Sequence, residues 1–211
     1  LASFLTLGSS GLPSPRTPTA NSTTEIADPE RIRYVPLDSS RFVIEGRTNV
    51  HDFTCVARNV DGFGNLPETQ EAQEAGASPY PIVPGVDVQL EVPVRALECG
   101  KNRINEDLYE TLKADRHPHI RFTLSAVTVR DTRTTSGRGN TYRLEVSGTL
   151  TIADSTRQVR FDMAGHRPQA GVVHGEGSTR LQMSSFGIEP PSALMGLIQV
   201  KDDITVRFDL A

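Results

Sequence analysis

The sequence predicts an all-β protein in which an antiparallel sheet of about eight strands is interrupted by one helix of about three turns. From residue 31 onward, apolar and polar residues alternate with period 2, the pattern of strands with one buried face. No helical pattern alternates with these strands, which excludes βαβ architectures. Because the apolar faces must be covered, the sequence favours either two packed sheets or one sheet closed into a barrel.

The clearest hairpin lies between Tyr142 and Met163. Apolar residues alternate with polar ones along its first strand, Asp154 and Ser155 supply a turn, and the alternation then resumes. The same alternation predicts six further strands, near residues 42–44, from 53 onward, and at 86–94, 120–124, 177–183 and 204–210.

A helix is predicted at roughly Arg103 to Ala114. Ile104, Leu108 and Leu112 follow one another at i, i+4 and i+8, so they form one apolar stripe that should pack on the sheet. Asn105 is a plausible cap, the acidic first turn suits the helix dipole, and "DRHPH" ends the pattern at residues 115–119. A second short helical segment is predicted at "PSALMGLI", residues 191–198.

The chain divides into a tail and one domain. Residues 1–30 are rich in Ser, Thr, Pro and Gly and lack apolar periodicity, which indicates a tail, or in part the remainder of a trimmed signal peptide. Residues 31–211 form the predicted barrel domain. Within it, the segment from Asp61 to Gly85 is acidic and rich in proline, which predicts a long loop.

Composition excludes several functional classes. The 22 basic and 26 acidic residues give a net charge of −4, which argues against a nucleic-acid partner. The chain has no tryptophan, so it lacks the best residue for a base-stacking platform. No apolar run is long enough for a membrane-spanning helix, and the mean hydropathy is −0.33.

No motif indicates catalysis. The five histidines are scattered, and neither the "HPH" at 117–119 nor any other segment has the spacing of a zinc site. No nucleophile elbow and no glycine-rich phosphate loop occur. The sequence therefore predicts a protein that is not an enzyme and that requires neither a metal nor a cofactor.

The two cysteines, Cys55 and Cys99, lie on or at the ends of predicted strands. In an extracytoplasmic protein they would form a disulfide that closes a loop of about 45 residues and contributes roughly 4 kcal/mol. In a reducing compartment they would be two buried thiols. The first interpretation is favoured.

Strand parity also assigns the interior of a barrel. An eight-stranded barrel is either filled by its side chains or holds one small ligand, and composition alone favours the filled interior over the ligand cavity. Such an interior lacks a charged partner, so selectivity should follow the length and shape of a ligand. The predicted inward-facing residues are Ile44, Phe122, Leu124, Leu144, Val146, Phe161, Met163, Val206 and Phe208.

Four motifs together resemble the YceI-like family of polyisoprenoid-binding, lipocalin-like barrels. They are "GRTNVHDFTC" (46–55), "LECGKNRINEDLYETLKADRHPHIRFTLSAV" (97–127), "GTLTIADSTRQVRFDMAG" (148–165) and "MSSFGIEPPSALMGLIQVKDDITVRFDL" (183–210). Asp154 replaces a commoner Gly of the family pattern, and Ser185 replaces an acidic residue. The resemblance covers residues 31–211.

The resemblance implies an extended eight-stranded antiparallel lipocalin-like barrel whose bore takes a polyprenyl or quinone-type lipid, in the periplasm or outside the cell. The implied ligand-binding residues are the nine inward-facing residues above and Met195. The alternative is a structural or accessory subunit of a larger extracytoplasmic assembly, with the tail as its contact arm. A homodimer is compatible with either function.

Overall fold

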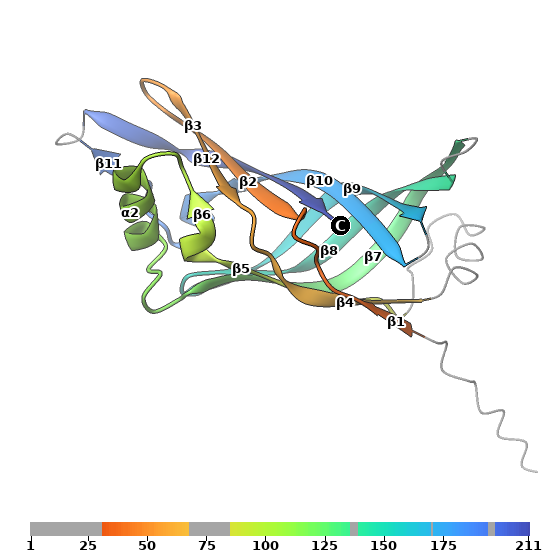
Figure 1. Cartoon of the computed structure of the whole chain (residues 1–211). Coiled ribbons are helices and arrows are strands. Elements are labelled where there is room, and N and C mark those ends of the chain that lie inside the picture. The colour runs from red at the N-terminus through yellow and green to blue at the C-terminus, as the bar shows by residue number, and fades with distance from the viewer. Residues whose placement is uncertain (1–30, 68–84, 136–138, 170, 194–196) are drawn as a thin grey trace, which may run out of the picture.

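The computed structural model describes residues 31–67, 85–135, 139–169, 171–193 and 197–211. These residues form a 12-stranded antiparallel sheet that curls into an elongated, incomplete barrel, with α2 at one end (Figure 1). The strands are β1 (Arg31–Tyr34), β2 (Arg41–Thr48), β3 (Asp52–Ala57), β4 (Asp61–Pro67), β5 (Asp87–Pro93), β6 (Leu97–Glu98), β7 (His119–Thr135), β8 (Gly139–Ile152), β9 (Ser155–Gln169), β10 (Val172–Gln182), β11 (Ser192–Ala193) and β12 (Ile198–Leu210). The helices are α2 (Asn102–Thr111) and the short 3₁₀ turns η1 (Val94–Ala96) and η2 (Met183–Phe186).

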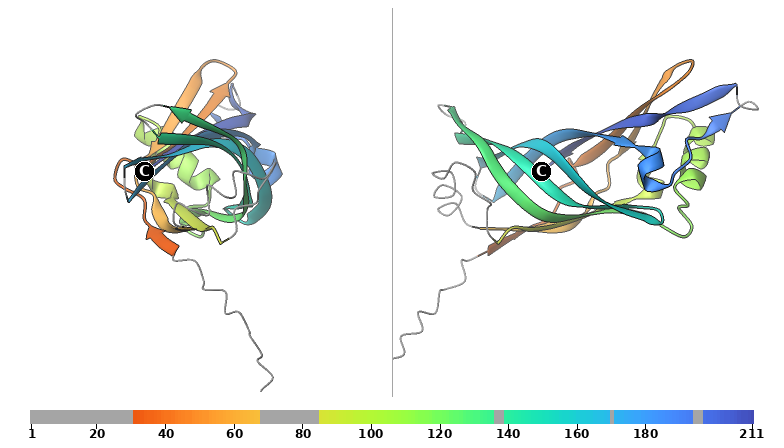
Figure 2. Two further views of the ribbon diagram at one scale, coloured as in Figure 1. Left: turned by 90° about the vertical axis from the view of Figure 1, so that its right-hand side faces the viewer. Right: turned by 180° about the vertical axis from the view of Figure 1, so that it is seen from behind.

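The sheet order is β1-β4-β5-β7-β8-β9-β10-β12-β2-β3-β6, and β11 pairs with β12. At the end that carries α2, β5 continues through η1 into β6, which pairs with β3 at Ala57↔Leu97. The chain therefore links the two sides of the barrel at that end. Among the described residues no ladder joins β4 to β2 or β3, so the hydrogen-bonded wall is interrupted along this side (Figure 2).

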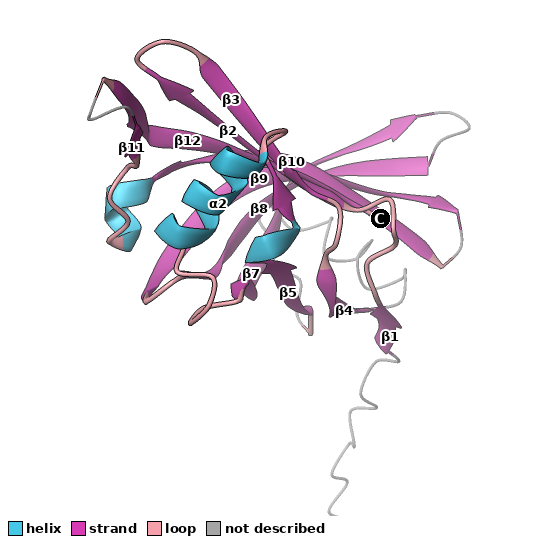
Figure 3. Ribbon diagram, turned by 60° about the vertical axis from the view of Figure 1, so that its left-hand side comes forward, coloured by secondary structure: helices cyan, strands magenta, loops and turns pink. Residues whose placement is uncertain are grey.

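The packed core lies at one end of the barrel rather than along its length. Buried residues from η1, from η2, from the segment directly after α2 and from the ends of several strands meet there, and α2 covers this end (Figure 3). We call this cluster the plug. Its residues are Ala57, Val92, Val94, Leu97, Leu112, Ala114, Ile152, Met183, Phe186 and Ile188.

The predicted all-β, barrel-like fold is confirmed, but the strand count is not eight. The predicted strands correspond to β2, β3, β5, β7, β8, β9, β10 and β12, and the sequence missed β1, β4, β6 and β11. β4 occupies Asp61–Pro67, part of the predicted loop. Its sequence, DGFGNLP, is poor in strand formers, and pairing with β1 and β5 overrides that local preference. The rest of the predicted loop, 68–84, lies outside the described residues, as does the predicted tail.

The prediction of a second helical segment was wrong where the structure describes it. Ser192 and Ala193 form β11, which pairs with Gln199 and Ile198 of β12. The Val200 amide also donates to the Pro191 carbonyl at 3.1 Å, so this segment is held as an extended return strand. Residues 194–196 lie outside the described part.

The helix α2 forms where the sequence predicts it, but its boundaries and cap differ. It begins one residue before the predicted start, at Asn102, and ends three residues before the predicted end, at Thr111. Lys113, just after the helix, adopts a left-handed conformation with φ 54°. Asn105 is not the N-cap. Its side-chain oxygen instead accepts a hydrogen bond from the Cys99 amide at 2.7 Å, which ties the helix to the preceding segment. Leu112 is buried and Leu108 is half-buried against the plug, so the predicted apolar stripe does face the barrel.

Cys55 and Cys99 form the predicted disulfide, with their Cα atoms 4.0 Å apart. The bond joins β3 to the segment between β6 and α2. Only two residue pairs hold β3 to β6, so the disulfide reinforces the link between the two sides of the barrel.

Candidate functional site

The strand register places nine of the ten predicted ligand-binding residues on one face of the sheet. Directly paired residues include Ile44 with Val206 and Leu144 with Met163, and the alternation continues along each strand. This face is concave, because aromatic rings from strands that are not neighbours meet on it. The tenth predicted residue, Met195, lies outside the described residues.

Four phenylalanines form a continuous row on this inner face. The ring centres are 6.1 Å apart for Phe42 and Phe208, 5.2 Å for Phe208 and Phe161, and 5.7 Å for Phe161 and Phe122. The row extends from β2 through β12 and β9 to β7. It gives the inner face an aromatic belt, which begins at the plug, against which Phe42 packs.

Glycines on the intervening strands make room for this belt. A Cβ at Gly148 would lie 2.4 Å from the ring of Phe122, and one at Gly177 would lie 2.6 Å from the ring of Phe208. The rings therefore lie close against the backbone of the neighbouring strand. Met163 uses Gly175 in the same way, since a Cβ at position 175 would lie 2.6 Å from the methionine methyl group.

The inner face is only partly covered by protein. Val146 and Phe208 are buried, with 4% and 7% of their surface exposed, whereas the other seven described residues are half-buried. In a core filled to native density, apolar side chains of this kind would be fully buried. The barrel is thus packed at the plug and retains accessible apolar wall beyond it.

A polar contact spans the end opposite the plug, which we call the mouth. The guanidinium carbon of Arg167 on β9 lies 5.9 Å from the ring centre of Tyr34 on β1. In the sheet order β4, β5, β7 and β8 separate these strands, so the contact crosses from one wall to the other. Strand parity continued from Met163 through Gly165 points to Arg167, but β1 was not predicted, and sequence reasoning missed the pair. The expectation of an interior without a charged group therefore fails at the mouth.

The outer face carries ion pairs between neighbouring strands. Arg207 contacts Glu45 at 2.9 Å, and Arg130 contacts Glu145 at 2.8 Å. The hydrogen bond from Arg130 holds the pKa of Glu145 below its usual value. These contacts stabilise the wall from the solvent side and leave the inner face apolar.

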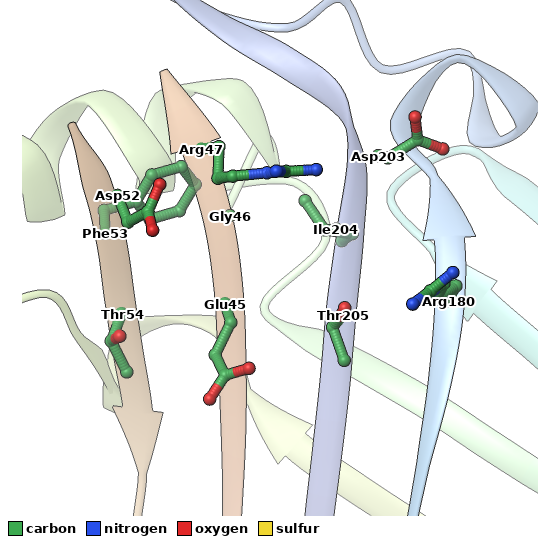
Figure 4. Close-up of a pocket in the computed structure, with 10 residues that line it drawn as sticks. All are labelled: Glu45, Gly46, Arg47, Asp52, Phe53, Thr54, Arg180, Asp203, Ile204 and Thr205. Carbon is green, nitrogen blue, oxygen red and sulfur yellow. The ribbon is translucent and has the colours of Figure 1, made fainter. Parts of the chain in front are cut away.

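A hollow of about 700 Å³ also lies over β2, β3, β10 and β12 (Figure 4). Charges of both signs line it, with Arg47 directed toward β12 and with Asp203 and Arg180 on the adjacent strands. This mixed polar lining does not match an apolar ligand. The inner face is the better candidate site.

His174 contacts both Asp209 and His166. His174 Nε2 lies 2.7 Å from Asp209 Oδ1, and the rings of His174 and His166 are 4.7 Å apart between centres. Partial burial acts to raise the pKa of Asp209, but hydrogen bonds from His174 and Arg41 outweigh it and lower that pKa. Within the described ranges, no three His, Cys, Asp or Glu side chains cluster to hold a metal ion. None of the helices in those ranges has the length and apolar character needed to cross a bilayer.

Comparisons with known proteins agree with this architecture. The YceI-like domain family matches residues 37–211. The structure is similar to BcnA of Burkholderia cenocepacia, with a TM-score of 0.62 and 17% identity, covering 84% of this chain and 98% of that one. A polyisoprenoid binding domain from Saccharophagus degradans gives a TM-score of 0.62 at 13% identity, covering 86% of this chain and 97% of that one.

A third similar structure is the YCEI protein of Campylobacter jejuni, with a TM-score of 0.50 and 14% identity, covering 78% of this chain and 83% of that one. A search of curated proteins finds no match. At these identities the structural likeness establishes the fold.

Proposed function

This chain belongs to the YceI-like domain family, and from that premise we propose that it binds one long apolar molecule, of polyprenyl or quinone type, along its inner face. The observation that carries the proposal is the half-buried state of seven inward-facing apolar side chains next to a fully packed plug. When a ligand covers accessible apolar surface inside a barrel, that surface leaves water and the free energy of the complex is lowered. We infer binding without catalysis and without a required cofactor.

The physical driving force is the removal of apolar surface from water. Each carbon of an isoprenoid chain that becomes buried contributes up to about 0.8 kcal/mol before the entropic costs of binding. The aromatic belt and the aliphatic residues Leu144, Met163 and Val206 supply a lining that needs no directional polar contact. A chain of matching length and width would be preferred.

We place the polar end of the ligand at the mouth, near Arg167 and Tyr34. The plug closes the other end with buried apolar residues, so a polar group there would lose its hydration without finding partners. A guanidinium and a tyrosine at the mouth offer donors and an aromatic surface. An anionic head group would suit this position best.

We propose a periplasmic or secreted location. A disulfide between Cys55 and Cys99 is typical of oxidising compartments and rare in the cytosol. In those compartments a carrier of water-insoluble lipid would keep its cargo out of the aqueous phase.

The test is lipid extraction of the purified protein followed by mass spectrometry. We expect a prenyl or quinone lipid from the wild type, and loss of that lipid from Leu144→Trp, which narrows the bore at a half-buried inward position. Arg143→Trp is the matched control, since Arg143 is the exposed neighbour on the outer face of the same strand. Recovery of no lipid from the folded wild type would overturn the carrier proposal and favour the scaffold alternative.

A further inference from the structure

Two exposed apolar side chains lie on adjacent tips beyond the plugged end. Among the described residues, the two most exposed large apolar side chains are Leu197 at 72% and Val50 at 62%. Val50 lies in the turn between β2 and β3, and Leu197 directly precedes β12. The β2–β3 turn and the start of β12 both project at the end of the molecule that carries α2 (Figures 1 and 3).

Asn49 fixes these two tips to each other. Its backbone N–H donates to the Gln199 carbonyl at 3.1 Å, and its side-chain NH₂ donates to the Leu197 carbonyl at 2.8 Å. Its side-chain oxygen accepts from the Gln199 N–H at 3.0 Å. Thr48 orders the turn as well, because its hydroxyl oxygen accepts from the amides of Val50 and His51 at 3.1 and 2.9 Å. The apolar side chains are therefore presented from two tips that hydrogen bonds hold together.

We propose that Val50 and Leu197 form a lipid-surface docking element, which inserts into the interfacial region of a bilayer. A bilayer interface accepts single aliphatic side chains, and binding strength grows with the apolar area inserted. A stable protein–protein interface needs about 800 Å² from each partner, far more than two isolated side chains supply. The inference goes beyond the proposed cargo and does not depend on an occupied bore.

The charges around the tips indicate which lipid surface fits. The exposed residues nearest in sequence include Arg47 and Lys201 but also Asp52 and Asp203, so cations and anions balance. Binding should thus rest on apolar insertion rather than on attraction to anionic lipid, and should depend little on salt.

The absence of tryptophan from the chain allows a site-specific test. Three single variants, Val50→Trp, Leu197→Trp and the control Val35→Trp, each give the protein one tryptophan at a known position. Val35 is 61% exposed, like Val50, but lies between β1 and β2, away from the tips. With phosphatidylcholine vesicles, we expect a blue shift of emission and quenching by brominated acyl chains for positions 50 and 197 alone. An equal response at position 35, or none at the tips, would overturn the proposal.

Partitioning of proteins without added aromatics completes the test. Val50→Ser with Leu197→Ser should lower the vesicle partition coefficient by about 10-fold or more for each side chain that inserts fully. Val35→Ser with Leu37→Ser, at exposed positions elsewhere, should leave it unchanged. Tip-dependent self-association in sedimentation without vesicle binding would assign the tips to a second copy of the chain and contradict lipid docking. If the protein does not bind vesicles, only the docking proposal is contradicted. The proposal of a bound lipid cargo is tested separately, by lipid extraction.

Discussion

The ring of Phe122 on β7 lies directly over Gly148 on β8, so close that a Cβ at position 148 would be 2.4 Å from the ring. The same Cβ would lie 2.6 Å from the backbone carbonyl oxygen of Thr123. The absence of a side chain at this one position lets Phe122 cross the neighbouring strand and reach Phe161. Continuity of the aromatic belt therefore depends on a glycine.

Gly148→Ala should destabilise the fold by about 1–3 kcal/mol, the usual cost of overpacking. The ring of Phe122 must leave its position, and the Thr123 carbonyl cannot move without disturbing the β7–β8 ladder. Urea unfolding followed by circular dichroism measures the effect. Gly165→Ala is the control and should cost less, because its new Cβ would meet the end of Leu144 at 3.2 Å and the His174 carbonyl oxygen only at 3.9 Å, an ordinary contact distance. Equal costs for the two variants would contradict the assigned role of Gly148.

Leu112→Ala should lower the free energy of unfolding by about 2–5 kcal/mol. Leu112 is 6% exposed within the plug, so truncation leaves a cavity between α2 and the barrel. Leu108 lies one turn earlier and is half-buried, and its truncation should cost less. A larger loss for Leu108→Ala than for Leu112→Ala, in denaturant unfolding, would show that the helix packs by a different face.

The alternation of residues predicted eight strands because each has a dry and a wet side. It missed β4 because Gly62, Gly64 and Asn65 carry no apolar pattern. The structure explains the glycine at 62: its φ is 134°, and a Cβ there would lie 2.1 Å from the carbonyl oxygen of Gln89 on β5. Such close approach of two strands is a property of the assembled sheet that local propensity cannot reveal.

The inner face was predictable from parity, since residues two apart on a strand share a side. The burial of each residue was not. Val146 is buried and Leu144 is not fully covered, although both alternate on the same strand. The contact of Arg167 with Tyr34 was also beyond sequence reasoning, because it joins strands at distant places in the sheet order.

Removal of the disulfide by Cys55→Ser with Cys99→Ser should cost roughly 4 kcal/mol, because the bond closes a loop with a sequence separation of 44 residues. Thermal unfolding of the wild type with a reductant should reproduce the loss, and the reductant should not affect the double variant. A double variant as stable as the oxidised wild type would contradict the role of the bond in joining the two sides of the barrel.

Asp202 should make the attachment of η2 to β12 sensitive to acid. Its carboxylate accepts hydrogen bonds from the hydroxyl and the amide of Ser184, at 2.5 and 2.7 Å, and these lower its pKa. A pKa lowered by folding means stability that is present above the unfolded-state value of about 4 and is lost as the pH falls through the folded value. The advantage of the wild type over Asp202→Asn should therefore be full at neutral pH and shrink below about pH 4. A difference in unfolding free energy between the wild type and Asp202→Asn that stays constant as the pH falls below about 4 would contradict this role of Asp202.

Arg167→Gln tests whether the mouth selects the charge of a ligand head group. If the guanidinium binds an anionic head, the wild type should prefer a prenyl phosphate over the prenyl alcohol of the same length. A charge-assisted hydrogen bond contributes about 1.5–3 kcal/mol, so the preference should be about 10-fold or more. The variant should lose this preference and bind the alcohol as before, because the apolar wall is unchanged. Competition for a fluorescent fatty acid in the bore would measure both affinities.

Arg160→Gln is the matched control for that experiment. Arg160 lies on the same strand but is exposed on the outer face, 3.9 Å from Glu145, so its loss should leave head-group preference intact. The preference of the wild type should also weaken as salt rises, since the mouth is partly exposed and its charge is screened. Equal affinity of the wild type for the phosphate and the alcohol would remove the head-group role of Arg167. Selection would then rest on the length and width of the chain, as the apolar lining alone predicts.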